Sequence, residues 1–205
     1  MHIVDRLKVY RFHRNRCHSG QNLNHKMQGW STEEEQRIRF NAIANSAEFS
    51  HKRVLDLGCG LGELYDYLSQ RDHLTFYLGI DQHWLFLRKA KKRIGTSRCR
   101  FRFADISRTS LPDFDIIVAS GSLNYRTRQT DYLECMIARM YDAAREAIIF
   151  NLLDKNVFSE SNLLQAYDKE TVVSYCRTLT PNVTLIDNYS ASDFTIVLKK
   201  TNTAG

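Results

Sequence analysis

Three glycines after a short apolar run mark the segment with the clearest chemical signal. Residues 54–64 read VLDLGCGLGEL, in which Gly58, Gly60 and Gly62 alternate. Alternating glycines permit positive φ and let a ligand approach the backbone without meeting a Cβ atom. The helix expected after this turn would offer free backbone N–H groups at its first residues. The segment therefore predicts a ligand-binding turn between a strand and a helix.

Two classes of cofactor fit such a turn. A dinucleotide fingerprint has the pattern GxGxxG, but Glu63 occupies its third glycine position when the count starts at Gly58. Asp56 adds a second carboxylate, and two carboxylates beside a pyrophosphate would repel it. S-adenosylmethionine (SAM) carries an ammonium and a sulfonium, which favour nearby acid. The pattern therefore favours SAM over a nicotinamide dinucleotide, and Cys59 is interpreted as a small residue within the turn.

Acidic residues also follow the next two expected strands. Asp81, followed by Gln82, can accept hydrogen bonds from both ribose hydroxyls, and it can also cap the helix that begins there. Asp105 can accept from the adenine amino group, while the backbone N–H of Ile106 reaches a ring nitrogen. The alternative for Asp105 is that it only caps a turn. The carboxyl ends of successive parallel strands meet at one edge of a sheet, where ligands bind.

The fourth expected strand ends in Ser120 and Gly121, which offer backbone groups and a small profile beside the methionine part of the cofactor. Asn124, Tyr125 and Arg126 follow, and they either meet a substrate or form an ordinary loop. A hydroxyl or ammonium acceptor would need a base to take its proton. Candidates for that base are Tyr125, His83, His25 and Asp154, although His83 is also consistent with the first turn of a helix.

Alternating patterns along the chain predict the elements that position these residues. Strands are expected at 53–57, 74–80, 100–103, 114–120, 147–151, 183–187 and 194–199, and helices at 1–16, 31–49, 61–70, 82–94, 129–145 and 169–179. The helix at 31–49 opens with a capping box, and the helix at 82–94 is expected to bury Trp84, Leu85 and Leu87. The pattern predicts an α/β fold with a doubly wound, mostly parallel sheet, helices on both faces and one antiparallel strand in a closing hairpin.

Composition and length bound the class of protein. The chain has 205 residues, of which 43% are hydrophobic and 25% charged, as in a globular domain. We divide it into an N-terminal helical extension or lid (1–50), a SAM-binding domain (51–200) and a tail (201–205). No apolar run approaches the roughly 18 residues of a membrane helix, and residues 1–17 do not resemble a secretory signal. The five cysteines are scattered without a CxxC pair, which predicts neither disulfides nor a metal site and fits a cytoplasmic location.

Positive charge is concentrated in one stretch of the sequence. The net charge is +6, and residues 82–104 contain no acid. Eight basic residues fall there: Arg88, Lys89, Lys91, Lys92, Arg93, Arg98, Arg100 and Arg102. Such a cluster either attracts a polyanion such as RNA or forms a solvated helix face.

Four of these motifs together resemble the class I SAM-dependent methyltransferases. They are VLDLGCGLGEL (54–64), LGIDQ (78–82), FADI (103–106) and FDIIVASG (114–121), and the resemblance covers about 53–200. It implies a seven-stranded sheet with an antiparallel last strand. It also implies that Gly58, Gly60 and Gly62 surround the methionine moiety, that Asp56 organises the turn, that Asp81 binds the ribose and that Asp105 contacts adenine.

The upstream segment is similar to the lead-in of a bacterial subset of these enzymes. There an N-terminal helix covers the cofactor, which implies that Trp30, Gln36 and Arg39 are lid or carboxylate contacts. Packing of Trp30 and Phe40 against the sheet is the alternative. The fourth strand is followed by SGSLNY rather than by the Asn-Pro-Pro-Tyr type of motif used for amino-directed nucleic-acid methylation. No cysteine stands there for a covalent cytosine-C5 mechanism.

These observations predict a SAM-dependent methyltransferase that acts on a small-molecule acceptor. Residues 151–167 form a long, partly apolar connection that would wall the acceptor pocket. One alternative is an RNA or protein methyltransferase that uses the basic stretch 88–102. A second alternative is a SAM-binding module without catalysis. The sequence predicts neither the acceptor atom nor the oligomeric state.

Overall fold

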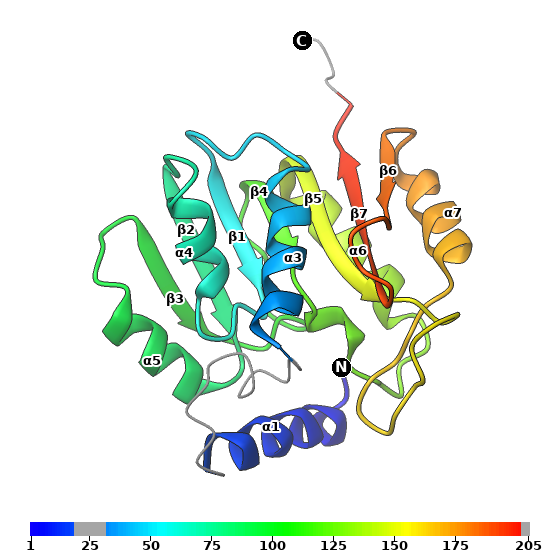
Figure 1. The fold of residues 1–205 in the computed structure, drawn as a ribbon, viewed down its shortest axis with the longest axis horizontal. Coiled ribbons are helices and arrows are strands. Elements are labelled where there is room, and N and C mark those ends of the chain that lie inside the picture. The colour runs from blue at the N-terminus through cyan, green and yellow to red at the C-terminus, as the bar shows by residue number, and fades with distance from the viewer. Residues whose placement is uncertain (19–31, 202–205) are drawn as a thin grey trace.

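The computed structural model describes residues 1–18 and 32–201, and in this part of the chain seven strands form one sheet (Figure 1). The strands are β1 (Arg53–Leu57), β2 (Phe76–Asp81), β3 (Cys99–Phe103), β4 (Phe114–Ala119), β5 (Ala144–Leu153), β6 (Val183–Ile186) and β7 (Asp193–Lys199). The helices are α1 (Ile3–His18), α3 (Glu33–Ala44), α4 (Glu63–Ser69), α5 (Trp84–Arg93), α6 (Tyr132–Ala143) and α7 (Lys169–Leu179), and η1 (Ser122–Asn124) is a short 3-10 turn.

The strand order is β3-β2-β1-β4-β5-β7-β6. Pairing is parallel from β3 through β5, whereas β7 runs antiparallel to both β5 and β6. The order reverses at β1, so ligands are expected beyond the carboxyl ends of β1 and β4. The predicted fold is therefore confirmed, including the single antiparallel strand.

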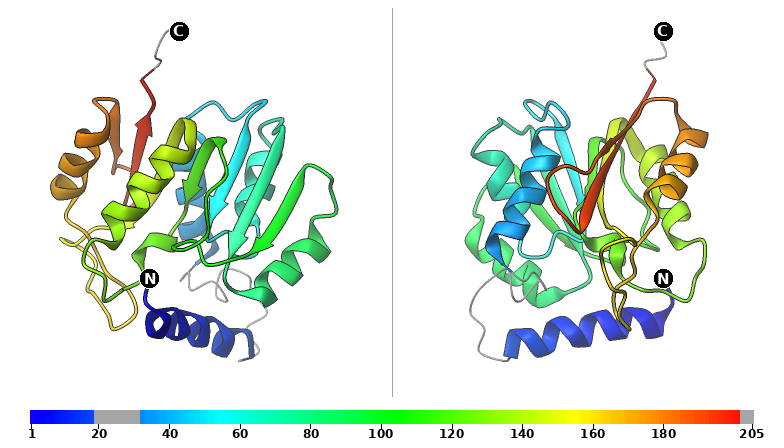
Figure 2. Two further views of the ribbon diagram at one scale, coloured as in Figure 1. Left: turned by 180° about the vertical axis from the view of Figure 1, so that it is seen from behind. Right: turned by 45° about the vertical axis from the view of Figure 1, so that its right-hand side comes forward.

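Helices cover both faces of the sheet, and each face has its own apolar core (Figures 1 and 2). Helices α3, α4 and α5 bury side chains such as Ile43, Leu68 and Leu87 against one face. Helices α6 and α7 bury side chains such as Ile137 and Val173 against the other. Residues 116–119 of β4 are buried on both faces of the sheet, which explains their continuous apolar sequence.

Helix α1 packs on neither face. It lies across the edge at which the parallel strands end, below the sheet in Figure 1. Of its hydrophobic side chains, Val9 is buried, whereas Ile3 and Leu7 are about half exposed (52% and 47%). Within the described residues no helix is long and apolar enough to cross a membrane.

Two local predictions are wrong. The helix expected over 31–49 ends at Ala44, although its start is confirmed because the Thr32 hydroxyl accepts a hydrogen bond from the Glu35 N–H (3.1 Å). Helix α5 buries Phe86, Leu87 and Ala90, while Trp84 is 45% exposed. Because α5 begins only at Trp84, positions 86, 87 and 90 face the sheet.

Candidate active site

A cavity of about 370 Å³ lies between the carboxyl ends of the parallel strands and α1. Side chains and backbone from five strand ends and from α1 and α3 line it. They include Val9, Tyr10, Phe12, His13, Arg39, Gly58, Gly60, Asp81, Gln82, His83, Phe86, Asp105, Ile106, Ser120, Gly121, Ser122, Asn124, Tyr125, Tyr132, Leu153, Phe158 and Leu164. Most of the predicted binding residues therefore meet in one place.

The glycine turn is constrained by its own backbone and by its neighbours. Gly58, Gly60 and Gly62 have φ values of 79°, 53° and 75°, and the Gly58 N–H donates to the Ile80 carbonyl (2.8 Å). A Cβ atom at Gly58 would lie 2.3 Å from the Cβ of Ser122. Gly58 and Gly60 line the cavity, while Gly62 and Cys59 do not. Gly62 instead caps α4, and Cys59 is buried in the core.

Asp56 lies beneath the turn and does not line the cavity. It is 2% exposed and accepts a short hydrogen bond from the Tyr77 hydroxyl on β2. Burial raises the pKa of this carboxyl to about 7, against the opposing effect of the Tyr77 hydrogen bond. The residue holds β1 to β2 rather than facing a ligand.

Asp81 lies in the cavity lining and links two segments of the backbone. Its carboxylate lines the cavity, and it accepts hydrogen bonds from the N–H groups of Gly60 (2.9 Å) and His83 (2.7 Å). Burial raises its pKa to about 6, although these backbone hydrogen bonds act in the opposite direction. The carboxylate thus ties the glycine turn to the start of α5 and still reaches the cavity.

Asp105 and Gln82 are both in contact with α1. One Asp105 oxygen accepts from the backbone and hydroxyl of Ser107 (2.9 and 2.7 Å), as a turn cap does. The other lies 3.1 Å from the Arg6 guanidinium, whose Nε also donates to the Gln82 side chain (3.2 Å). Two of the residues predicted to bind the nucleoside, Asp105 and Gln82, are therefore linked to α1 by one arginine.

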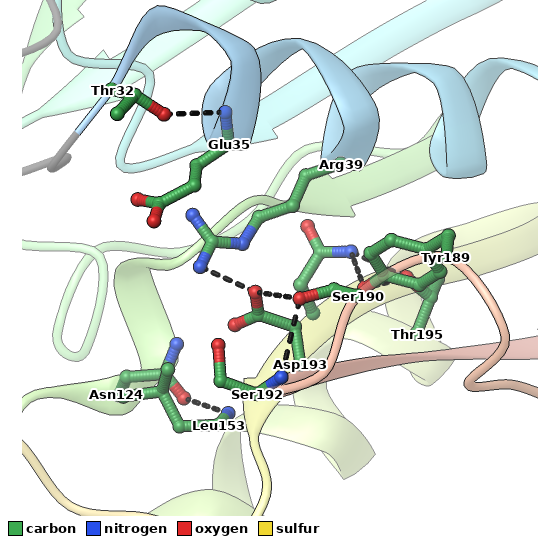
Figure 3. A network of polar contacts seen from close by, with 11 residues as sticks. Thr32, Glu35, Arg39, Asn124, Leu153, Tyr189, Ser190, Ser192, Asp193 and Thr195 are labelled. Atoms are coloured by element: carbon green, nitrogen blue, oxygen red, sulfur yellow. Dashed lines mark hydrogen bonds and ion pairs between the residues drawn. The ribbon is translucent and has the colours of Figure 1, made fainter.

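The end of β4 supplies small and polar groups. Gly121 has a φ of 72°, and the Ser122 hydroxyl donates to the Leu57 carbonyl (2.5 Å). The side-chain Oδ1 of Asn124 accepts from the Leu153 N–H (3.1 Å), which fixes the loop to β5 (Figure 3). The buried Ser120 hydroxyl has no hydrogen-bond partner among the described residues, so it is available to a ligand.

Tyr125 contacts a residue that sequence analysis did not propose. Its hydroxyl lies 2.7 Å from Nε2 of His13, a buried side chain on α1. Burial, together with Asp81, raises the pKa of the Tyr125 hydroxyl. No sequence motif joins two residues so far apart in the chain, and only the position of α1 brings them together.

The other three candidate bases differ in position. His83 lines the cavity, but burial and His13 lower its pKa to about 4, which makes it a weak base at neutral pH. Asp154 lies outside the cavity lining and forms an ion pair with Lys169 (3.0 Å). His25 falls outside the described residues.

Of the three residues predicted as lid or carboxylate contacts, one lines the cavity. Arg39 lines the cavity, and its Nη2 donates to Asp193 at the start of β7 (2.5 Å; Figure 3). Gln36 donates to Glu63 (2.7 Å) and is not part of the lining. Trp30 falls outside the described residues. The cover over the cavity is α1, while α3 packs on the face of the sheet.

The basic stretch runs from α5 into β3, and most of its side chains are exposed. Some of them also have partners within the fold: Arg93 pairs with Asp66 and donates to the Leu61 carbonyl, and the Arg100 guanidinium lies over the Phe76 ring. Over the described ranges, no group of three His, Cys, Asp or Glu side chains could hold a metal ion.

Comparison with known proteins gives concordant matches. Residues 54–146 match the family described as methyltransferase domain. The Mycobacterium tuberculosis protein Rv1506c, itself named only provisionally as a methyltransferase, is 31% identical over 169 residues, which cover 77% of this chain and 98% of that protein.

Solved structures share the fold at low identity. Magnesium protoporphyrin IX methyltransferase from Synechocystis with bound SAM is 13% identical, with a TM-score of 0.70 over 96% of this chain and 97% of that one. The N-methyltransferase NodS of Bradyrhizobium japonicum with S-adenosyl-L-homocysteine (SAH) is 18% identical, with a TM-score of 0.69 over 93% and 97%.

Proposed function

The chain belongs to the class I SAM-dependent methyltransferases, and we propose that it methylates a small molecule enclosed between α1 and the carboxyl ends of β1, β4 and β5. SAM is its cofactor. The observation that carries the proposal is the cavity itself, because α1 covers the strand ends at which the family binds its cofactor.

The residues present fit SAM. The cavity offers Gly58 and Gly60 from the turn, together with the carboxylate of Asp81. Ser120 adds a buried hydroxyl without a partner in the described part of the chain. We assign Gly58, Gly60, Ser120 and Gly121 to the methionine part, Asp81 and Gln82 to the ribose, and Asp105 and Ile106 to adenine. Asp56, Cys59 and Gly62 shape the turn from behind, and Arg39 borders the site.

Helix α1 must adjust for adenine to reach Asp105. Arg6 already pairs with that carboxylate, and Gln82 accepts from the same guanidinium. An adenine amino group would replace Arg6 at Asp105 or share the carboxylate with it. Contacts of α1 are therefore part of cofactor binding in this proposal.

When bound, SAM would supply a methyl group attached to a sulfonium, which is a good leaving group. The protein aligns the acceptor with that methyl group and excludes water, and such alignment can supply roughly 7–11 kcal/mol of the barrier. Leu153, Phe158 and Leu164 line the cavity, as the predicted connection 151–167 would. The cavity of about 370 Å³ is at the small end of the roughly 300–1,000 Å³ typical of ligand sites and has to hold SAM as well, which favours a small acceptor.

Isothermal titration with SAH tests the proposal. We expect SAH to bind with an affinity that changes little between 50 and 200 mM salt. A steep loss of binding to a structured RNA over the same salt range would favour the RNA alternative, because phosphate contacts release counterions. Absence of SAH binding would overturn the assignment. Binding without turnover of any acceptor would favour a non-catalytic SAM-binding module.

A further inference from the structure

Two histidines and a tyrosine meet in the part of the cavity beneath α1. The rings of His13 and His83 have centroids 6.0 Å apart, and His13 contacts the hydroxyl of Tyr125. The three residues come from α1, from the residue before α5 and from the residue after η1. All three line the cavity, so a ligand within it contacts them.

The His13–Tyr125 pair is suited to receive a proton. Burial raises the pKa of Tyr125, so its hydroxyl remains protonated at neutral pH and lies 2.7 Å from Nε2 of His13, to which it can donate when that nitrogen carries no proton. The Tyr125 oxygen keeps its lone pairs for a second hydrogen bond, which the hydroxyl of an acceptor can donate. The titratable groups that face this pair are His83, Asp81 and Arg16.

His83 is a buried polar group that still needs a partner. It is 2% exposed, and neither ring nitrogen has a hydrogen-bond partner in the described residues. The rings of Tyr10 and Phe86 lie 4.9 and 4.2 Å from it, centroid to centroid. Leaving such a group unsatisfied in the folded protein is unfavourable. A polar group on a bound ligand would remove that cost.

The wall next to this pair is mostly aromatic. From α1 the lining residues within 9–13 are Val9, Tyr10, Phe12 and His13, and Phe86 and Phe158 continue it. None of these side chains carries a carboxylate, and His13 is the one basic group among them. An ammonium on the acceptor would therefore gain no counter-charge from these side chains, whereas a planar uncharged ring would pack well against them.

Resting on the proposed function, we propose that the acceptor is a small uncharged aromatic compound that is methylated on a phenolic hydroxyl. Tyr125 is the catalytic residue that contacts this hydroxyl, His13 is a positioning residue behind it, and His83 binds a second polar group of the acceptor. As the oxygen–methyl bond forms, the sulfur–methyl bond breaks and its electron pair stays on sulfur. The acceptor proton passes to Tyr125, whose own proton passes to Nε2 of His13.

Binding to the SAH-loaded protein tests the ligand class. The probes are 4-hydroxyacetophenone, which has a phenol and a carbonyl, and 4-methylacetophenone, which lacks the hydroxyl. We expect the phenol to bind at least 10-fold more tightly in isothermal titration. Tyr125→Phe should abolish this preference while the Kd of SAH stays within about twofold. Tyr141→Phe on α6 serves as the matched control and should keep the preference.

A second variant separates proton transfer from positioning. His13→Gln keeps a hydrogen-bonding group beside Tyr125 but cannot take its proton. We expect phenol binding within about threefold of wild type, a fall in kcat of roughly 100-fold or more with SAM, and loss of the acid limb in the pH profile of kcat. An unchanged pH profile would overturn the role of His13.

The outcomes distinguish the two proposals. If SAH binds but the two probes bind alike, or if 4-(aminomethyl)acetophenone binds more tightly than the phenol, the phenol inference is wrong and the methyltransferase assignment stands. If SAH itself does not bind, the proposed function fails and the inference fails with it.

Discussion

The glycine turn and α1 face each other across the cavity but are held in different ways. The turn is joined to β2 through backbone hydrogen bonds, such as that from Gly58 to Ile80, and it stands on a buried core. Helix α1 buries one aliphatic side chain, Val9, and is otherwise attached through polar contacts of Asp5, Arg6 and His13. Ring contacts of Tyr10 and His13 with His83 and Phe86 add to these. The comparison indicates that the cofactor side forms with the fold, whereas the cover can open at small cost.

The largest expected effect is that of Gly58→Val on the turn. A branched side chain would combine a left-handed φ with a collision against Ser122, and we expect the free energy of unfolding to fall by about 3 kcal/mol. For a domain of this size that lowers Tm by roughly 6–12 °C. Thermal unfolding measures it. Gly95→Ala is the control, since a Cβ there meets no atom within 4 Å; equal shifts in both variants would contradict the account.

A smaller effect is expected for Asp81→Asn. This substitution should change the affinity for SAH and leave the free energy of unfolding unchanged. The substitution weakens hydrogen bonds to a cofactor hydroxyl, and we expect the Kd of SAH to rise by roughly 10–150-fold, or about 1.5–3 kcal/mol. Stability should not fall, because burial already raises the pKa of this carboxyl to about 6. Titration calorimetry with Asp142→Asn on α6 as control measures the change. An unchanged Kd would remove Asp81 from the cofactor site.

The buried carboxylate beneath the turn gives a pH test. The pKa of Asp56 is about 7 in the folded protein and near 3.8 when unfolded, so the folded state binds more protons between these values. Its contribution to stability is present below pH 4 and is lost as pH rises through 7. Asp56→Asn should therefore gain about 2–3 kcal/mol relative to wild type between pH 5 and pH 8. Urea unfolding of both proteins at pH 5 and pH 8 measures this gain. If the difference in free energy of unfolding between variant and wild type is the same at both pH values, Asp56 does not titrate as expected.

The smallest effect is expected on the side of α1. Asp5 accepts hydrogen bonds from the Arg128 N–H (3.0 Å) and the Thr127 hydroxyl (3.3 Å). Asp5→Ala should loosen α1 by about 1 kcal/mol and leave the global Tm nearly unchanged. Hydrogen exchange over residues 3–16 should accelerate, with Lys8→Ala on the exposed side of the same helix as control. If exchange in β1 accelerates equally, α1 and the sheet form one cooperative unit and the comparison fails.

The sequence predicts the glycine turn better than it predicts the position of α1, for a physical reason. Gly58, Gly60 and Asp81 lie within two consecutive strand–helix units, so local pattern and backbone pairing place them together. The contacts of His13 with Tyr125 and of Arg6 with Asp105 join residues about a hundred or more positions apart in the chain. No local sequence pattern predicts which residues so far apart will meet. Asp56 was expected to organise the turn, but its partner is the Tyr77 hydroxyl, which only the register of β1 against β2 reveals.

The position of β7 has a consequence for how the chain folds. During synthesis β6 emerges before β7, yet in the sheet β6 pairs only with β7, and β7 in turn covers the edge of β5. Until residues 193–199 arrive, β5 presents an unpaired apolar edge that could join a strand of another chain. Nascent chains are therefore most vulnerable to aggregation in that interval, and docking of β7 ends it by completing the sheet.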